Sequence, residues 1–390
     1  MRNPLSDKIV NIPPSGIRKF FDIVSEMKDA ISLGVGEPDF ETPWHIREEG
    51  IYSLEKGRTF YTSNAGLKPL KVEICEYLKR RCGVVYDPDR EVLVSVGGSE
   101  AIDLAMRAML NDGDEVLVPQ PSYVSYMPCV TLADGVPVAI QLEEKDQFRL
   151  TPEKLLEKIT DKTKILVLPF PNNPTGAIME REDLEKIVEI VLEKDLFVVS
   201  DEIYSELTYG DEPHVTIASF PGMKERTVLI NGFSKAYAMT GWRLGYAAAP
   251  AAILEQMLKI HQYAIMCAPT TSQYAAVSAL KNGDPDVAMM RESYNQRRRF
   301  LLHAFAEMGI ECFEPKGAFY TFPNIKRFGM TSEEFATRLL QEEKVAVVPG
   351  TAFGDCGEGF VRISYAYSLK NLKEALSRIE RFINRLDGKA

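Results

Sequence analysis

The chain has 390 residues, which is enough for two domains that each bury a core of their own. Apolar residues make up 45% and charged residues 26%, the balance of an ordinary globular protein. The formal net charge of −10 argues against nucleic acid or an anionic membrane surface as the main partner.

The first residues, Met-Arg-Asn-Pro-Leu-Ser-Asp-Lys, lack the apolar core of a signal peptide. No apolar run approaches the roughly 20 residues that span a bilayer. The six cysteines show neither close pairing nor metal-ligand spacing, and the four histidines are scattered. We therefore expect reduced thiols, no metal site and a cytoplasmic protein.

Between residues 90 and 250, short apolar runs alternate with helical patterns. Several runs are apolar throughout, which is typical of strands covered on both faces by helices. Strand–helix–strand alternation predicts an α/β fold with a mostly parallel sheet. The seven expected strands are Val92–Val96, Val116–Val118, Val136–Leu142, Ile165–Leu168, Leu196–Ser200, Val228–Ile230 and Leu244–Ala249.

The last hundred residues show a different pattern. Helices expected near 291–308, 332–343 and 369–386 alternate with short strands at 318–322, 345–348 and 360–364. This pattern predicts a smaller α+β domain over residues 291–390, after a large domain over 46–290. Residues 1–45 have weak periodicity and several prolines, so we expect them to pack with the small domain.

In open α/β sheets, ligands collect beyond the carboxyl ends of the strands. The first expected strand runs into Gly97-Gly98-Ser99-Glu100, which opens a helical pattern and so offers free N–H groups to an anion. A plain helix cap explains these residues equally well. Tyr123 follows the second strand, where its ring can stack on a heteroaromatic ligand or simply pack in a loop.

Two more strands end in polar residues. Asn173 lies in the turn Asn173-Pro-Thr-Gly and can donate its amide to a ligand oxygen, although the same motif is common in plain turns. Asp201 ends a buried strand, where its carboxylate can cap a helix or hold a proton on a pyridine nitrogen. Tyr204, three residues on, can share the phenolic oxygen of such a ring with Asn173.

Lys235 comes shortly after Thr227–Ile230, an apolar run that we expect to be a buried strand. A lysine in that position can form an imine with an aldehyde, and Arg243, eight residues on, can bind a phosphate. An aldehyde that carries a phosphate describes pyridoxal 5′-phosphate (PLP). An unperturbed lysine has a pKa of about 10.4, and burial beside Arg243 would favour the neutral amine.

A substrate site is suggested by two further positions. Arg362 lies inside an expected strand of the small domain, where it can grip a carboxylate with two hydrogen bonds or form a structural salt bridge. Gly36 gives a flexible backbone that can approach a ligand closely or make a simple turn.

Taken together, these motifs resemble those of the class I/II aminotransferases of PLP fold type I, over nearly the whole chain. The shared motifs, in the family's order, are Asn173-Pro-Thr-Gly, Asp201-Glu-Ile-Tyr204, Ser234-Lys235 with Arg243, and Val361-Arg362-Ile-Ser. The resemblance implies a large domain with a mostly parallel seven-stranded sheet and a smaller α+β domain. It also implies a homodimer with shared active sites.

The resemblance assigns a role to each candidate residue. Lys235 is expected to hold PLP as an imine and to move the substrate proton, with Asp201 on the pyridine nitrogen and Tyr123 stacked on the ring. The other expected contacts are Asn173 and Tyr204 with the ring oxygen; Ser99, Glu100, Ser234 and Arg243 with the phosphate; Tyr61 with the neighbour's phosphate; and Gly36, Asn173 and Arg362 with the substrate carboxylate.

The implied reaction moves an amino group from an L-amino acid to a 2-oxo acid, with 2-oxoglutarate as the expected acceptor. Within the family, the chain looks closest to bacterial aromatic, aspartate-type and N-acetyl-LL-diaminopimelate aminotransferases. Aspartate-preferring relatives often carry a lysine where this chain has Ser99, which argues against strict preference for dicarboxylates. Arg18 is a candidate replacement for that lysine.

A PLP-dependent carbon–sulfur β-lyase is the alternative, because the same motifs serve elimination. A PLP-sensing regulator is less favoured, since no basic DNA-binding extension is evident.

Overall fold

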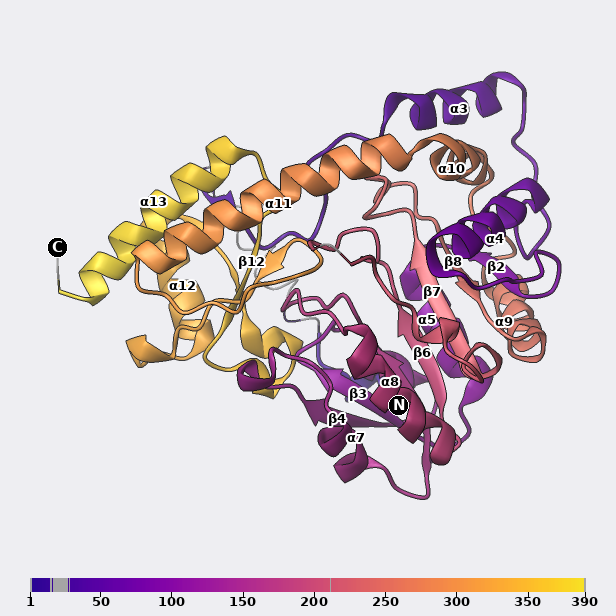
Figure 1. Cartoon of the computed structure of the whole chain (residues 1–390), viewed down its shortest axis with the longest axis horizontal. Helices are drawn as coiled ribbons and strands as arrows, with labels where there is room; N and C mark the ends of the chain where they lie inside the picture. The colour runs from indigo at the N-terminus through magenta and orange to yellow at the C-terminus, as the bar shows by residue number, and fades with distance from the viewer. Residues whose placement is uncertain (1, 15, 17–26, 28, 211, 389–390) are drawn as a thin grey trace.

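The computed structural model describes residues 2–14, 16, 27, 29–210 and 212–388. A large domain with a central sheet lies beside a smaller domain of short strands and helices, and one long helix runs between them (Figure 1). Among the described residues, no helix combines the length and apolar character needed to cross a bilayer.

The large domain is built on a seven-stranded sheet with the strand order β2-β8-β7-β6-β5-β3-β4. Every neighbouring pair is parallel except the two pairs made by β8, so the expected mostly parallel α/β sheet is confirmed. The strands are β2 (Val92–Ser95), β3 (Glu115–Gln120), β4 (Val136–Gln141), β5 (Thr163–Leu168), β6 (Phe197–Asp201), β7 (Thr227–Gly232) and β8 (Gly245–Ala248).

Helices cover both faces of this sheet. In β5, Ile165 and Val167 pack into one apolar cluster, whereas Leu166 and Leu168 point to the opposite face and pack into another. Full burial of such side chains contributes about 1.5–3 kcal/mol each, which is why these strands are apolar throughout. One face is covered by α5 (Gly98–Met109), α6 (Tyr126–Leu132) and α9 (Ala251–Ala264). The other is covered by α4 (Lys68–Cys82), α7 (Pro152–Lys158), α8 (Arg181–Glu193) and α10 (Thr270–Asn282), with α3 (Trp44–Glu55) packed on α10.

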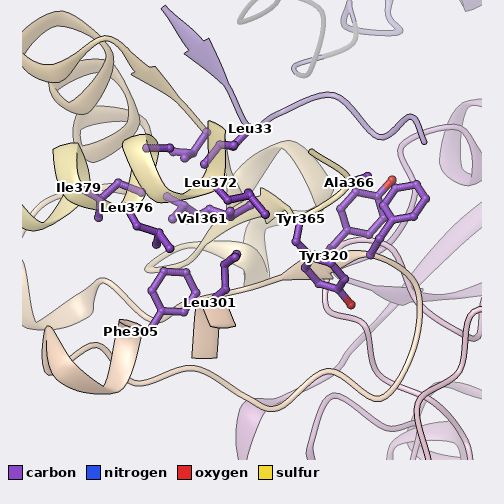
Figure 2. Packing of buried hydrophobic residues seen from close by; sticks show 14 of the residues in the cluster. Leu33, Leu301, Phe305, Tyr320, Val361, Tyr365, Ala366, Leu372, Leu376 and Ile379 are labelled. Carbon is purple, nitrogen blue, oxygen red and sulfur yellow. The ribbon is translucent and has the colours of Figure 1, made fainter. Parts of the chain in front are cut away.

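The small domain packs three helices around an antiparallel sheet of order β11-β12-β9. In its core, Leu301 and Phe305 of one helix face Leu376 of another (Figure 2). The elements are α11 (Asp284–Glu307), β9 (Tyr320–Thr321), α12 (Ser332–Glu343), β11 (Val348–Pro349), β12 (Val361–Ser364) and α13 (Leu369–Leu386).

The N-terminal segment contacts both domains, whereas the sequence predicts packing with the small domain. Strand β1 (Ile31–Ser32) pairs in parallel with β10 (Val345–Ala346) of the small domain, and Leu33 is buried in that domain's core. Earlier in the segment, Lys8 of α1 (Asp7–Val10) forms an ion pair with Asp134, just beyond α6 of the large domain.

Helix α11 begins at Asp284, earlier than the expected start near residue 291. Gly283 and a proline at the start of the helix suggest a break in the sequence, but proline is well tolerated in a first helical turn, and the acidic residues there favour a start. Val287 packs in a large-domain cluster and Leu301 in the small-domain core. The predicted boundary at residue 290 therefore lies within a continuous helix that links the domains (Figure 1).

Replacing Leu301 by Ala should lower the free energy of unfolding by about 2–5 kcal/mol, because it leaves a cavity in the small-domain core. Leu301 is 0% exposed, whereas Met289 on the same helix is 55% exposed. The Met289→Ala control should change the unfolding free energy by no more than about 0.5 kcal/mol. Urea denaturation followed by circular dichroism measures both, and equal effects of the two substitutions would contradict this packing.

Candidate functional site

The carboxyl ends of the parallel strands face a pocket of about 320 Å³ that lies between the two domains. Every described site residue predicted from the sequence lines this pocket except Glu100 and Tyr61. The lining comes from the large domain, from Gly36 of the N-terminal segment, and from Tyr320 and Arg362 of the small domain. Segments far apart in the sequence therefore meet at one cavity.

Lys235 lies three residues beyond the end of β7, and its amine is buried in the pocket. Its Nζ donates a hydrogen bond to the carbonyl oxygen of Gly36 at 2.7 Å. Burial lowers the pKa of Lys235 to about 8, with Arg362 and Arg243 acting in the same direction against Glu37 and Asp201. With that pKa, about a tenth of the amine is neutral at pH 7, a far larger fraction than for a solvated lysine.

Asp201 is the last residue of β6, and its carboxylate is buried at the pocket wall. One oxygen accepts a hydrogen bond from the Tyr126 hydroxyl at 2.7 Å, and the other accepts one from the backbone N–H of Ile203 at 3.2 Å. Burial raises the pKa of Asp201, and these two hydrogen bonds lower it. The side chain is thus fixed in direction, and a cationic N–H in the pocket would stabilise its charged form.

At the end of β2, the pocket has an anion-binding character. Gly97 caps helix α5, so the N–H groups of Gly98 and Ser99 begin the helix without intrahelical acceptors. The Arg243 guanidinium lies over Gly97, where an added Cβ would come within 2.7 Å of Nη2. Only glycine allows this approach, and Gly97 also has a φ of +81°.

The side chain of Glu100 is directed away from this cradle. Its carboxylate accepts a hydrogen bond from the backbone N–H of Val96 and contacts Nδ1 of the buried His261 at 2.6 Å. Only the backbone N–H of Glu100 can therefore face an anion at the start of α5, whereas its side chain fixes the preceding loop.

Arg362 defines the opposite end of the pocket. Its Nη1 donates to Oδ1 of Asn173 at 2.8 Å, and its Nη2 donates to the carbonyl of Gly34. Its Nε is buried and has no hydrogen-bond partner among the described residues. An unsatisfied donor on a buried guanidinium is costly, so this end of the pocket suits an acceptor such as a carboxylate.

Two predicted residues lie outside the pocket or outside the described chain. Tyr61 is 79% exposed and lies near Phe60 and Thr270, away from the cavity of its own chain. Its contact with a neighbour's phosphate stays a prediction. Arg18 lies outside the described residues.

Sequence reasoning missed two tyrosines that line the pocket, Tyr126 and Tyr320. Tyr126 begins α6, three residues after Tyr123, and the only signal in the sequence is its closeness to that candidate residue; the two rings meet edge to face at 5.7 Å. Tyr320 stands in an apolar run of the small domain, and its sequence context gives no sign of its partners.

Comparison with known proteins identifies the family. The chain belongs to the class I and II aminotransferases, whose family pattern matches residues 28–379. It is 52% identical to a putative aminotransferase, YugH, of Bacillus subtilis (99% of this chain, 100% of the relative) and 48% identical to an aspartate aminotransferase of Pyrococcus abyssi (97% and 98%). The structure of an aromatic aminotransferase from Pyrococcus horikoshii superposes with a TM-score of 0.91 at 47% identity, over 94% of this chain and 99% of that one.

Members of this family use PLP and act on amino acids and 2-oxo acids, so the chain is a transaminase. Its membership of the family confirms PLP as the expected cofactor. The named relatives are aminotransferases, which does not favour the β-lyase alternative. The pocket fits PLP: it combines a buried amine with a lowered pKa, a buried carboxylate and an anion cradle beside Arg243.

The lowered pKa of Lys235 predicts how fast the cofactor-free protein captures an aldehyde. Only the neutral amine reacts, so the rate of pyridoxal capture should rise about tenfold per pH unit below pH 8 and level off above it. Stopped-flow absorbance measures the rate. A rate that keeps rising towards pH 10, as for a solvated lysine, would contradict the burial effect.

Proposed function

We propose that this transaminase uses the pocket residues in the roles that the sequence predicts, with an aromatic amino acid as its favoured donor and 2-oxoglutarate as acceptor. One observation carries the proposal: a buried amine, a buried carboxylate and a buried guanidinium with a free donor converge on a single pocket from separate parts of the chain. Aspartate and N-acetyl-LL-diaminopimelate are the other candidate donors.

Different residues of the pocket would bind different parts of the cofactor. Bound PLP supplies an aldehyde for imine formation and a ring that withdraws electrons once its nitrogen is protonated. Asp201 would hold the proton on that nitrogen, and its hydrogen bond from Tyr126 fixes the direction of the carboxylate. The first N–H groups of α5, together with Ser234 and Arg243, hold the phosphate. Tyr123, whose hydroxyl lies 3.2 Å from that of Ser99, would stack on the ring.

The substrate's α-carboxylate binds at Arg362, whose Nε is available as a donor. The amide oxygen of Asn173 already accepts from Arg362, so its NH₂ group is the part that reaches a ligand oxygen. The neutral amine of Lys235 would then take the proton from the substrate Cα and deliver it to the former aldehyde carbon of the cofactor, and the second half of the reaction would reverse this transfer. The pocket lies between the domains, so closure of the small domain over the bound substrate would exclude water and strengthen each of these interactions.

The charges of the pocket bear on the choice of donor. Among the described residues that line it, the cations are Lys235, Arg243 and Arg362, and each has a role in this scheme. None of the three is left for a second carboxylate on the donor. This distribution of charge supports an aromatic donor over aspartate.

A screen of half-reactions tests the function. Adding a single amino acid without an oxo acid should change the cofactor's absorbance and release one equivalent of 2-oxo acid per site, with phenylalanine or tyrosine faster than aspartate. The Lys235→Ala variant should show neither change, because it lacks the amine that moves the proton, whereas Lys370→Ala, on the exposed face of α13, should match the unsubstituted protein. Continuous release of pyruvate and ammonia without an oxo acid would instead indicate a lyase.

We propose further that the chain acts in the cytoplasm as a homodimer with shared sites. Tyr61 and Phe60 are 79% and 81% exposed, which is unusual for neighbouring aromatic residues of a chain that acts alone. Their position outside the pocket of their own chain agrees with a role in a partner's site.

Subunit mixing tests the shared site. When Lys235→Ala subunits are mixed with Tyr61→Ala subunits, half of the dimers should combine the two variants, and each should contain one intact site. The mixture should therefore reach about a quarter of the activity of the unsubstituted protein, above the mean of the two unmixed variants. Activity equal to that mean would place Tyr61 outside the partner's site.

A further inference from the structure

Tyr320 is a pocket residue without a role in the scheme above. It lies in β9, where its Cα pairs with Ser364 of β12, and it is 1% exposed. Its hydroxyl lies 2.8 Å from the hydroxyl of Tyr204. Tyr204 follows β6 of the large domain, so this hydrogen bond joins the two domains at the pocket wall.

The ring of Tyr320 holds the guanidinium of Arg362. The guanidinium carbon lies 4.5 Å from the ring centre of Tyr320 and 4.8 Å from that of Phe353. A cation against an aromatic ring is attracted by the negative face of the ring, and the attraction is larger when both are buried. Arg362 is 2% exposed, so these ring contacts help to fix the orientation in which it faces the substrate.

The hydroxyl of Tyr320 also packs closely against Gly36, whose backbone contacts Lys235. A Cβ added to Gly36 would lie 2.2 Å from this oxygen, so only glycine fits there. The carbonyl of Gly36 accepts the hydrogen bond from Lys235. Tyr320 thus touches the guanidinium, the Tyr204 hydroxyl and the backbone that holds the amine.

The protons on the Tyr204 and Tyr320 hydroxyls determine which hydrogen bonds the two residues can donate. Burial raises the pKa of both Tyr204 and Tyr320, so both hydroxyls keep their protons. One proton fills the hydrogen bond between them. When Tyr320 donates to Tyr204, the Tyr204 proton is left for an acceptor in the pocket, and donation into its oxygen makes Tyr204 a stronger donor.

We propose that Tyr320 is a positioning residue with two separable functions: its ring orients Arg362 for the substrate carboxylate, and its hydroxyl orients Tyr204 as a donor to the phenolic oxygen of the cofactor. This inference rests on the proposed function, because it assumes the roles of Arg362 and Tyr204 given above. It predicts that changes to the ring and to the hydroxyl affect different measurements.

Tyr320→Phe keeps the ring and removes the hydroxyl. The pH midpoint at which bound PLP changes its absorbance should rise by about half a unit to one unit, because the ionised ring oxygen loses part of its hydrogen bonding. The KM for the amino acid should stay unchanged. The matched control is Tyr365→Phe, which removes the hydroxyl of another buried small-domain tyrosine, bonded to the Ala318 carbonyl and outside the pocket; its midpoint should equal that of the unsubstituted protein.

A double substitution shows whether the effect passes through Tyr204. Tyr204→Phe should shift the midpoint by itself, and adding Tyr320→Phe should shift it no further, since the two hydroxyls form one unit. Additive shifts would contradict the inference. An unshifted midpoint in Tyr320→Phe would also overturn it, while leaving the proposed function intact. Failure of the unsubstituted protein to bind PLP would instead refute the proposed function.

Tyr320→Leu removes the ring as well and provides an independent measurement. It should raise KM for the amino acid about tenfold, and it should leave KM unchanged for an amine with the same side chain but no carboxylate. Equal KM changes for the amino acid and the amine would show that the ring does not act through Arg362.

Discussion

The amine of Lys235 is buried between groups of opposite charge, and the chemistry of the pocket depends on this position. Burial disfavours the ammonium form and lowers the pKa of the lysine to about 8, and the two arginines of the pocket add to the effect. The nearby carboxylates of Glu37 and Asp201 oppose it. An amine in this balance is neutral often enough to react with an aldehyde, yet it can still take up a proton near neutral pH.

The fold brings the required partners to that amine. Parallel strands place Ser99, Asn173, Asp201 and Lys235 beyond one edge of the sheet, since each follows or ends a strand that points the same way. The small domain adds Arg362 from the opposite side. Helix α11 packs into the cores of both domains, and the hydrogen bond between Arg362 and Asn173 joins the domains at the pocket itself (Figure 1).

The sequence predicts the parts of this site that depend on local patterns. A charged residue at the end of an apolar strand, such as Asp201, is visible without a structure, and so is Lys235 after β7. Contacts between segments that are distant in the sequence cannot be predicted from such local patterns. Arg362 and Asn173 are 189 positions apart, and nothing local in either segment indicates the other. Tyr320 was overlooked for the same reason, because its ring looks like one more apolar residue of a short strand.

Some local signals were also ambiguous. The glycine before α11 and the proline in its first turn suggest a break, and the helix instead starts there because proline suits a first turn. Helix α1 packs near α6, with the Lys8–Asp134 ion pair among its contacts, and no pattern in the sequence links these two segments. The side chain of Glu100 turns to His261, 161 positions away, so its sequence position gave only the role of its backbone.

Chemical trapping of the cofactor tests the central claim most directly. The protein is incubated with PLP, reduced with borohydride and digested, and the labelled peptide is identified by mass spectrometry. Stoichiometric label on Lys235 alone is the expected result, because this amine is buried in the pocket that also holds an anion cradle and the buried carboxylate of Asp201. Label spread over exposed lysines, or stoichiometric label on another residue, would contradict the account.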